Sequence, residues 1–246
     1  KPLIIIGISA INYSDGKNVL NLSAEIAKKL INKTESFNPL NILQQNISRV
    51  GALDINFYNS IFDYNFEENL KNEISNKKPV VFLLGQDEIN FDLLKGSFVV
   101  YLGHHGDKGA ACADIVLPTP AYTEKNSTYV NAEGRIIQTS RSHNPLGEAK
   151  EEWKIFRALS ESFNKKLKFN NLNELRNDIV EFYPSFKNLF VKPTFNKLSF
   201  GSEVLVKDRN ISYNIENFYM TDSISRSSET MAHCTKEILN KVTKGA

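Results

Sequence analysis

Cysteine is scarce in this sequence, and no apolar run is long enough to span a membrane. Two cysteines, Cys112 and Cys234, are too few for a disulfide scaffold, so we expect reduced intracellular thiols, with a single bridge as the open alternative. The longest apolar runs, at residues 3–6 and 80–84, have the length of strands and fall far short of the roughly 20 residues that cross a bilayer. We therefore expect neither a disulfide-stabilised nor a membrane-spanning protein.

A strong excess of one charge is also absent. Thirty basic and 28 acidic side chains leave a formal net charge of +2, so no global field would recruit nucleic acid or an anionic membrane. Apolar residues make up 41% and charged residues 24%, which is typical of folded proteins. The length of 246 residues predicts one or two domains. The sequence starts at Lys1 with neither an initiator methionine nor a leader pattern, so we expect a processed or partial chain.

Short apolar runs without alternation indicate strands that are buried on both faces. Such runs, each ended by a glycine or a proline, occupy residues 3–7, 79–85, 98–103 and 115–118. Apolar residues at helical spacing lie between them, at residues 18–30 and 66–74. The sequence therefore predicts an α/β fold with a mostly parallel sheet and helices on both of its faces.

The pattern changes towards the C-terminus. Residues 153–163 have helical spacing after an acidic start, which predicts a docking helix. Residues 164–216 are rich in Asn and Lys and contain one further predicted helix at residues 172–182. A last helix is expected with Thr221 or Asp222 as its N-cap. We predict two domains, an α/β domain at residues 1–163 and a less regular C-terminal extension with docking helices at residues 164–246.

A glycine-rich segment, residues 103–109, lies where a predicted strand ends. Open α/β sheets bind their ligands at such strand ends, and glycines let a phosphate approach backbone N–H groups. The spacing of these glycines matches neither the dinucleotide-binding motif nor the P-loop. We favour a structural turn over a ligand site for this segment.

The same part of the chain holds potential metal ligands and a potential nucleophile. The residues of suitable type for zinc are His104, His105, Asp107 and Cys112. Adjacent histidines cannot easily converge on one ion, and no second ligand pair with suitable spacing follows. As a nucleophile, Cys112 or Cys234 would need a neighbouring base, and the sequence identifies none. We favour neither a metal site nor a nucleophilic site.

The densest polar segment spans residues 124–135. Its carboxylates Glu124 and Glu133 could do acid–base work if their environments separated their pKa values. Alternatively, its Asn, Glu and Arg side chains could hydrogen-bond the backbone of a long crossing segment, with Gly134 permitting a positive φ. We favour the structural role.

A family resemblance begins at residues 113–118, which read ADIVLP. Together with residues 124–138 they resemble the ADVVLP and ExxGTxxNxEGRxQ signature of the molybdopterin oxidoreductase superfamily, whose catalytic members place this loop beside a pterin cofactor. Ser127 stands where the signature has glycine, and Ile136-Ile137 adds a residue before the glutamine, which argues against cofactor binding here. The resemblance implies a structural motif of seven residues: Asp114, Pro118, Glu124, Asn131, Glu133, Gly134 and Arg135.

Further segments are similar to the large iron–sulfur (75 kDa) subunit family of respiratory complex I, NADH:ubiquinone oxidoreductase. They are residues 51–54 (GALD), 103–107 (GHHGD), 121–125 (AYTEK), 147–149 (GEA) and 218–226 (FYMTDSISR). The last of them resembles the mitochondrial or alphaproteobacterial form. In this family, cysteines of an N-terminal region ligate the clusters, and two isolated cysteines cannot supply such a ligand set. The resemblance implies the C-terminal part of such a subunit, with no catalytic, cofactor-binding or metal-binding residue of its own.

The role that the resemblance implies is a scaffold within complex I. Iron–sulfur clusters would lie in the missing N-terminal part or in a partner chain, and the partners would be other peripheral-arm subunits, not nucleic acid. The location implied is the matrix side of the mitochondrial inner membrane, or the cytoplasmic face of a bacterial one. One alternative is a cofactor-binding fragment of a true molybdopterin oxidoreductase, with Glu124, Asn131 and Arg135 near the pterin. Another is an α/β module that binds a small phosphorylated ligand at residues 103–109.

Overall fold

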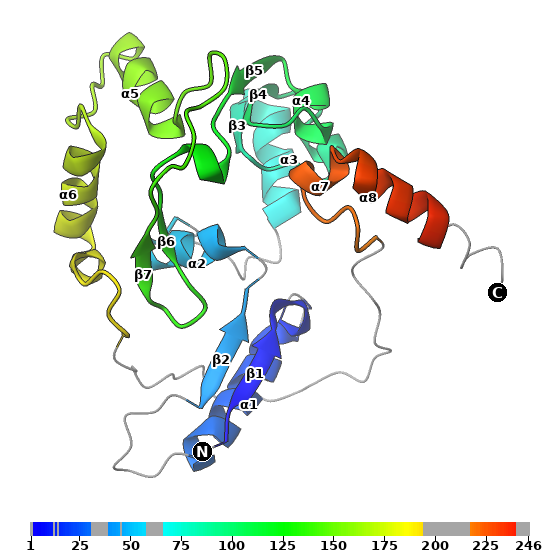
Figure 1. Ribbon diagram of the computed structural model, residues 1–246, viewed down its shortest axis with the longest axis vertical. Coiled ribbons are helices and arrows are strands. Elements are labelled where there is room, and N and C mark those ends of the chain that lie inside the picture. Colours follow the sequence, from blue (N-terminus) through cyan, green and yellow to red (C-terminus); the bar gives the residue numbers. More distant parts are fainter. Residues whose placement is uncertain are drawn as a thin grey trace. The chain divides into compact units, whose positions relative to one another are not determined.

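The computed structural model describes residues 2–11, 13, 15–30, 39–44, 46–57, 66–193 and 217–239 (Figure 1). The chain divides into two compact units, each made of three separate stretches of sequence. The first unit comprises Lys1–Tyr64, Asn126–Thr139 and Phe169–Ile211, and the second comprises Asn65–Lys125, Ser140–Lys168 and Ser212–Ala246. The domain boundary expected between residues 163 and 164 stays a prediction.

A parallel pair of strands forms one part of the first unit. Strand β1 (Ile4–Gly7) continues into a short 3-10 helix, η1 (Ile8–Ala10), and pairs in parallel with β2 (Leu40–Leu43). Helix α1 (Gly16–Leu30) lies between the two strands in sequence and packs an apolar face against them, because its apolar residues recur at intervals of three and four. The buried residues of this core are Ile6, Ile8, Ile11, Leu20, Ala24, Ala27 and Leu40.

A β-hairpin with helices around it forms the other part of the first unit. Strands β6 (Thr128–Val130) and β7 (Ile136–Gln138) pair antiparallel. Residues of α2 (Ile47–Asp54), α6 (Leu172–Phe182) and η4 (Pro184–Lys187) pack against the hairpin. The buried residues here are Val130, Ile136 and Phe186. The polar segment at residues 124–135, expected to belong to a long crossing segment, therefore contains a strand and a hairpin turn.

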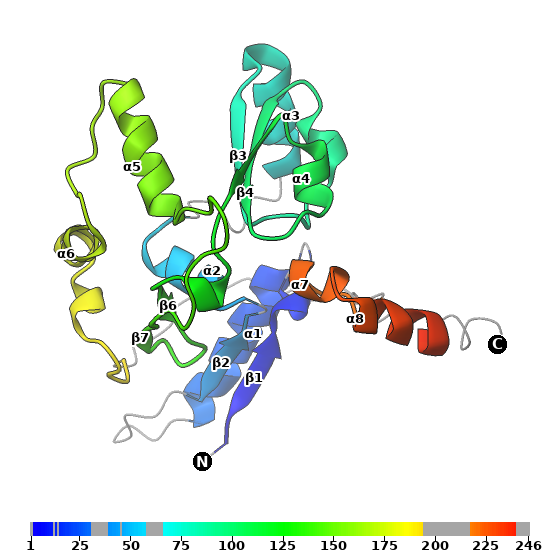
Figure 2. The ribbon, with the colours of Figure 1, turned by 45° about the horizontal axis from the view of Figure 1, so that its top comes forward.

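A parallel three-stranded sheet organises the second unit. Its order is β3 (Val80–Leu84), β4 (Phe98–Gly103) and β5 (Ile115–Pro118). Helices α3 (Phe66–Lys77) and α4 (Lys108–Cys112), with η2 (Phe91–Leu94), pack on one face of β3 and β4 (Figure 2). The buried residues between them are Ile74, Leu83, Leu94, Val99 and Tyr101.

The remaining helices of the second unit are short. Residues 122–124 form η3 (Tyr122–Glu124), and α5 (Glu152–Ser162) confirms the helix predicted at residues 153–163, whose docking role stays a prediction. Near the C-terminus the structure has α7 (Ser223–Arg226), α8 (Glu229–Cys234) and the π-helix η5 (Thr235–Leu239), so the last predicted helix is interrupted after its first turn.

The α/β fold class with parallel strands and helices is confirmed. Helix α1 contains the predicted helical residues 18–30 and begins at Gly16, in agreement with a predicted N-cap at Ser14 or Asp15, and the helix predicted at residues 172–182 has those bounds. The irregular region expected at residues 164–216 falls partly outside the described residues, which omit 194–216. Within the described part of the chain, no helix combines the length and the apolar character that a bilayer crossing requires.

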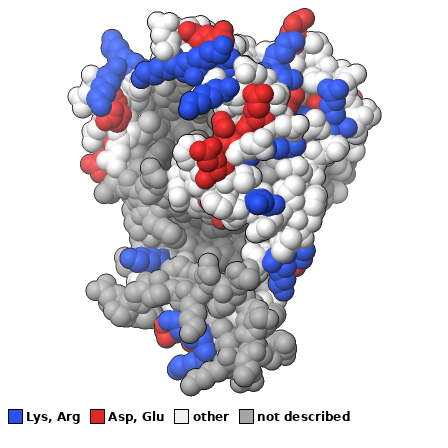
Figure 3. Space-filling model, turned by 90° about the vertical axis from the view of Figure 1, so that its left-hand side faces the viewer, with Lys and Arg blue, Asp and Glu red and all other residues white. Residues whose placement is uncertain are grey.

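The surface carries both signs of charge. On the face in Figure 3, acidic and basic side chains are interspersed, in keeping with the net charge of +2. Helix α5 contributes two pairs of this kind, Lys154 with Glu151 at 2.8 Å and Arg157 with Glu161 at 2.9 Å. In each pair one side chain is largely buried and the other is exposed, since Glu151 is 14% and Arg157 13% exposed.

Candidate functional site at the carboxyl edge of the three-stranded sheet

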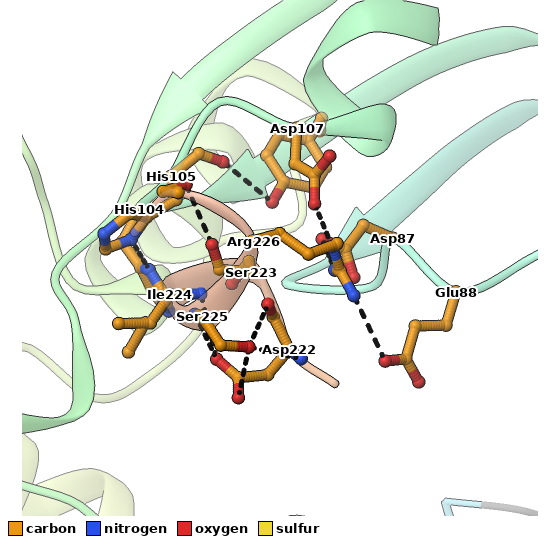
Figure 4. Close-up of polar contacts among 12 residues, drawn as sticks. Asp87, Glu88, His104, His105, Asp107, Asp222, Ser223, Ile224, Ser225 and Arg226 are labelled. Carbon is orange, nitrogen blue, oxygen red and sulfur yellow. Dashed lines mark hydrogen bonds and ion pairs between the residues drawn. The ribbon is translucent and has the colours of Figure 1, made fainter. Parts of the chain in front are cut away.

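The carboxyl ends of β3 and β4 form the place where an α/β sheet would bind a ligand. Asp87 lies in the loop after β3, and Asp107 lies in the loop after β4, immediately before α4. Figure 4 shows a third side chain between these two loops, Arg226 from the end of α7. All three belong to the second unit.

Arg226 bridges the two loops with its guanidinium group. Its Nη2 donates a hydrogen bond of 2.6 Å to Asp87 Oδ2, and its Nε donates to Asp107 Oδ2. Its Nη1 lies 3.7 Å from Glu88 Oε1. The Arg226 side chain is 17% exposed, Asp87 is 7% exposed and Asp107 is 18% exposed, so the pairs are largely withdrawn from water. Such charge-assisted bonds are among the stronger ones that a protein forms.

The pKa shifts agree with this geometry. Burial alone would lower the pKa of the Arg226 guanidinium, but the hydrogen bonds and charges of Asp107 and Asp87 raise it above its ordinary value. Burial alone would raise the pKa of the Asp107 carboxyl, but Arg226 and the Lys108 N–H group hold it below its ordinary value. Arg226 and Asp107 are therefore both charged at neutral pH.

The N-cap of α7 fixes the position from which Arg226 reaches the sheet. Asp222 Oδ1 accepts hydrogen bonds from the backbone N–H groups of Ile224 (2.9 Å) and Ser225 (3.1 Å). The Asp222 N–H group donates in return to Ser225 Oγ at 3.0 Å, which completes a capping box. The bond from the Ser225 N–H group is the largest cause of a lowered pKa at Asp222. The run at residues 218–226 thus builds a capped turn that ends in the bridging arginine.

Two of the glycines near this edge make room for Tyr101, a buried residue of β4. A Cβ atom on Gly103 would lie 2.3 Å from Tyr101 Oη, and one on Gly109 would lie 2.4 Å from Tyr101 Cε2. A Cβ on Gly106 would meet nothing within 4 Å. Packing of one aromatic ring therefore accounts for Gly103 and Gly109 without a phosphate, which supports a structural turn at residues 103–109.

The charges at this edge also oppose a phosphorylated ligand. One guanidinium faces Asp87, Asp107 and, at longer range, Glu88, so carboxylates outnumber the cation. An anionic phosphate placed there would be repelled by groups that are only partly screened by water. Helix α4 has five residues, and its N-cap Asp107 makes no side-chain cap bond because its carboxylate binds Arg226.

The residues weighed as zinc ligands or nucleophiles do not assemble a reactive centre. His104 Nδ1 lies 2.5 Å from His105 Nδ1, and burial, followed by the charges of His105 and Lys125, lowers the pKa of His104. Cys112 Sγ donates to the Gly109 carbonyl at 3.3 Å, and burial raises the pKa of this thiol, which disfavours the thiolate. Among the residues that the structure describes, no three His, Cys, Asp or Glu side chains are grouped to hold a metal ion.

Three residues of the family motif lie in the second unit, and each is used by the backbone there. Asp114 Oδ2 accepts from the Val99 N–H group at 2.7 Å, across from β5 to β4. The Pro118 carbonyl accepts from the Lys150 N–H group at 3.1 Å. Glu124 Oε2 accepts from the N–H group of the alanine three residues earlier at 3.0 Å. These bonds tie the strand end and the segment after it together.

The other four motif residues form the turn of the β6–β7 hairpin in the first unit. Asn131 Oδ1 accepts from the N–H groups of Glu133 (2.9 Å) and Arg135 (3.0 Å). Gly134 has φ of 78°, a left-handed conformation that favours glycine. Arg135 Nη1 donates to the Phe190 carbonyl at 2.8 Å, and its Nε donates to Glu133 Oε2 at 3.3 Å. The structural role favoured for this segment is consistent with these bonds and stays a prediction.

The three residues placed near a pterin in the alternative interpretation are each hydrogen-bonded within the chain. The Glu124 carboxylate, the Asn131 amide oxygen and the Arg135 guanidinium already bind the protein's own chain. A Cβ on Gly134 would lie 2.9 Å from Pro193 Cγ, so the chain itself packs against the hairpin turn.

Sequence reasoning misses the Arg226 bridge. Arg226 ends a family-like run, but no pattern in the sequence pairs it with Asp87, which lies 139 positions away. One signal is present, since Asp87 lies two residues after the strand-ending Gly85 and Asp107 lies four residues after the strand-ending Gly103. The negative charges of two acidic residues at neighbouring strand ends must be neutralised by a nearby cation or hydrated by water.

Comparison with known proteins gives two matches to family models. The molybdopterin oxidoreductase model matches residues 1–162, and the model of the C-terminal part of the G subunit of NADH-ubiquinone oxidoreductase matches residues 187–234. The second match includes Arg226, and the first includes both Asp87 and Asp107. The ion pairs at the sheet edge therefore join the two matched regions.

Curated relatives resemble the chain over nearly its full length. The mitochondrial NADH-ubiquinone oxidoreductase 78 kDa subunit of Candida albicans is 40% identical over 99% of this chain and 34% of the relative. The NADH-ubiquinone oxidoreductase 75 kDa subunit of Reclinomonas americana is 40% identical over 96% of this chain and 34% of the relative. The G subunit of the NADH-quinone oxidoreductase of Rickettsia bellii is 37% identical over 96% of this chain and 33% of the relative. The similarity to large complex I subunits is confirmed, and the chain spans about a third of their length.

Proposed function

Because the chain belongs to the molybdopterin oxidoreductase family, and because its curated relatives are large complex I subunits, we propose that it is a scaffold portion of such a subunit. In this role it supports electron transfer from NADH to ubiquinone without performing a chemical step. The observation that carries the proposal is the Arg226 bridge, in which the edge of the sheet that could bind a ligand binds the protein's own chain.

The position of the bridge supports a complex I role over a catalytic molybdopterin role. Arg226 lies in the region matched by the NADH-ubiquinone oxidoreductase model, and its two partners lie in the region matched by the molybdopterin oxidoreductase model. The complex I segment thus anchors itself at the edge of the α/β sheet where a ligand would otherwise lie. Displacing it would leave Asp87, a carboxylate that is 7% exposed, without its cation.

The proposal extends to cofactors, partners and location. The iron–sulfur clusters would be held by the part of the large subunit outside this chain or by a partner chain, and electrons would pass through those clusters. The partners would be that part and other subunits of the peripheral arm. The chain would lie on the matrix side of the mitochondrial inner membrane, or on the cytoplasmic face in a bacterium.

Affinity purification from the native source tests this proposal. The chain carries a tag, the co-purifying proteins are identified by mass spectrometry, and the eluate is assayed for iron, molybdenum and pterin. We expect complex I core subunits, and iron that leaves with those subunits when they are stripped away. A chain that purifies alone with pterin and molybdenum would instead establish a molybdopterin oxidoreductase fragment.

A further inference from the structure

In the second unit, the β3–β4–β5 sheet has one face on which the side chains of β3 are exposed. Residues paired in a parallel sheet point to the same side, so the face is defined by alternate residues of the three strands. Helices α3 and α4 pack against the opposite face (Figure 2). The exposed members of the open face are Val80, Phe82, Leu84, Phe98 and Ile115.

The exposed members of this face are all apolar. The Val80 side chain is 56% exposed and Leu84 is 47% exposed, although each lies in a strand of a parallel sheet. Parallel sheets are almost always covered on both faces, and solvated sheet faces normally alternate apolar with polar residues. Val100 and Leu102 of β4, which share this face, are buried, so the open part of the face lies mainly over β3. An exposed apolar surface of this kind marks an interaction site.

A groove continues this face towards α5. The ring of Phe82 lies 5.5 Å from that of Phe156, at an interplanar angle of 57°, and this contact joins β3 to α5. Beside it opens a groove of about 450 Å³, which is also lined by Leu159, Phe163 and Leu167, with Ser160 and Lys165 as its polar members. The Phe163 side chain is 68% exposed. The face and the groove together form one apolar surface, which we call the β3 surface.

We propose that the β3 surface docks the part of the complex I large subunit that lies outside this chain. This inference rests on the proposed function. The chain accounts for about a third of its relatives' length, so about two thirds of such a subunit remains to be placed against it. If that part packs on the open face, both faces of the parallel sheet are covered, as is usual for such sheets. An apolar partner surface is required, because Val80, Phe82 and Leu84 offer no hydrogen-bonding side chain.

Lysine substitutions on the β3 surface test this proposal in the native source. Val80→Lys and Leu84→Lys together put two cations where the isolated surface is open to water but the docked surface is not. The measurement is the fraction of the chain that runs with assembled complex I on a native gel, normalised to the total chain on a denaturing gel. We expect this fraction to fall at least tenfold.

Two control variants separate docking from general damage. Phe182→Lys places one lysine, half the charge of the test pair, on α6 of the first unit at a side chain that is 75% exposed, and should assemble as the unaltered chain does. Val80→Ile with Leu84→Met keeps the surface apolar and should also assemble. If the lysine pair assembles normally, or if the controls fail equally, the β3 surface is not the docking site.

Other outcomes remain distinguishable. An unaltered chain that is absent from complex I refutes the proposed function itself. A band of twice the chain mass that the lysine pair abolishes would identify a second copy as the occupant and overturn the proposal. If the lysine variant is degraded, Val80→Cys in a chain whose Cys112 and Cys234 are replaced by serine gives a second measurement. Its thiol should resist maleimide in assembled complex I and react after denaturation, and equal reaction in both states would overturn the proposal.

Discussion

Replacing Arg226 by methionine should destabilise the second unit by about 2–4 kcal/mol. Methionine keeps the unbranched apolar stem of the side chain, without the guanidinium, and leaves Asp87 and Asp107 without their cation. Removing one partner of a buried pair typically costs about 3–5 kcal/mol, and the partial exposure of Arg226 and Asp107 brings the expected value towards the lower end.

Urea unfolding monitored by the fluorescence of Trp153 measures this effect. Trp153 is the one tryptophan in the sequence and lies in α5 of the second unit, so it reports on the unit that contains the bridge. Lys95→Met is the matched control, because Lys95 pairs with Asp92 at 2.7 Å in the same unit but both side chains are well exposed. The control should leave the unfolding midpoint unchanged.

A second substitution checks the physical reason. In the Arg226→Met background, Asp87→Asn removes one of the carboxylates left unpaired and should restore about 1 kcal/mol. In the unaltered background, Asp87→Asn should destabilise. A loss for Arg226→Met of less than about 0.5 kcal/mol, within the range of ordinary surface substitutions, would refute the reasoning that the bridge holds the two loops together.

The pH dependence follows from the sign of the Asp107 shift. Because the pKa of Asp107 is lower in the folded chain than in the unfolded chain, its contribution is complete above the unfolded value of about 3.9. That contribution is lost as the pH falls through the folded value. In Arg226→Met, the pKa of Asp107 rises relative to the unaltered chain because the guanidinium that lowers it is lost, so the stability difference between the two proteins should narrow as the pH falls through the folded value. An equal pH profile for both proteins would contradict the assignment.

Three further predictions concern the turns and the phosphorylated-ligand alternative. Gly109→Ala should lower the free energy of unfolding in urea by about 1–3 kcal/mol, because its Cβ would overlap the Tyr101 ring. The control Gly106→Ala should be neutral, and equal effects of the two substitutions would contradict the packing role of Gly109. Asn131→Ala should cost about 1–2 kcal/mol by thermal unfolding, because two backbone N–H groups lose their acceptor, and an unchanged melting temperature would count against this. Inorganic phosphate or ATP should not raise the melting temperature, and a saturable rise would support a ligand site at residues 103–109.

Local patterns are enough to predict most of the elements. The apolar runs that form β1, β3, β4 and β5 are strand-sized and end at a glycine or a proline, so both their type and their bounds could be predicted. The helix at residues 172–182 has strong apolar periodicity and an asparagine N-cap, which accepts from the Glu174 N–H group. In these cases local preference and tertiary packing favour the same structure.

The long-range contacts could not be predicted in the same way. No periodicity relates Arg226 to Asp87, because a side-chain pair 139 residues apart is created by the fold alone. The glycines at 103 and 109 suggest a phosphate loop, since their true neighbour, the ring of Tyr101, is visible only in three dimensions. The hairpin at residues 128–138 is hidden by its polar turn, which Asn131 organises through hydrogen bonds to the backbone.

The central claim is that this chain supports complex I assembly and performs no chemical step. Depleting the chain in its native source, then measuring both assembled complex I on native gels and NADH:ubiquinone oxidoreductase activity, tests that claim most directly. The account predicts that activity falls in proportion to the assembled complex, with the turnover per assembled complex unchanged. A complex that assembles at its normal level without the chain, or that assembles but loses turnover, would contradict it.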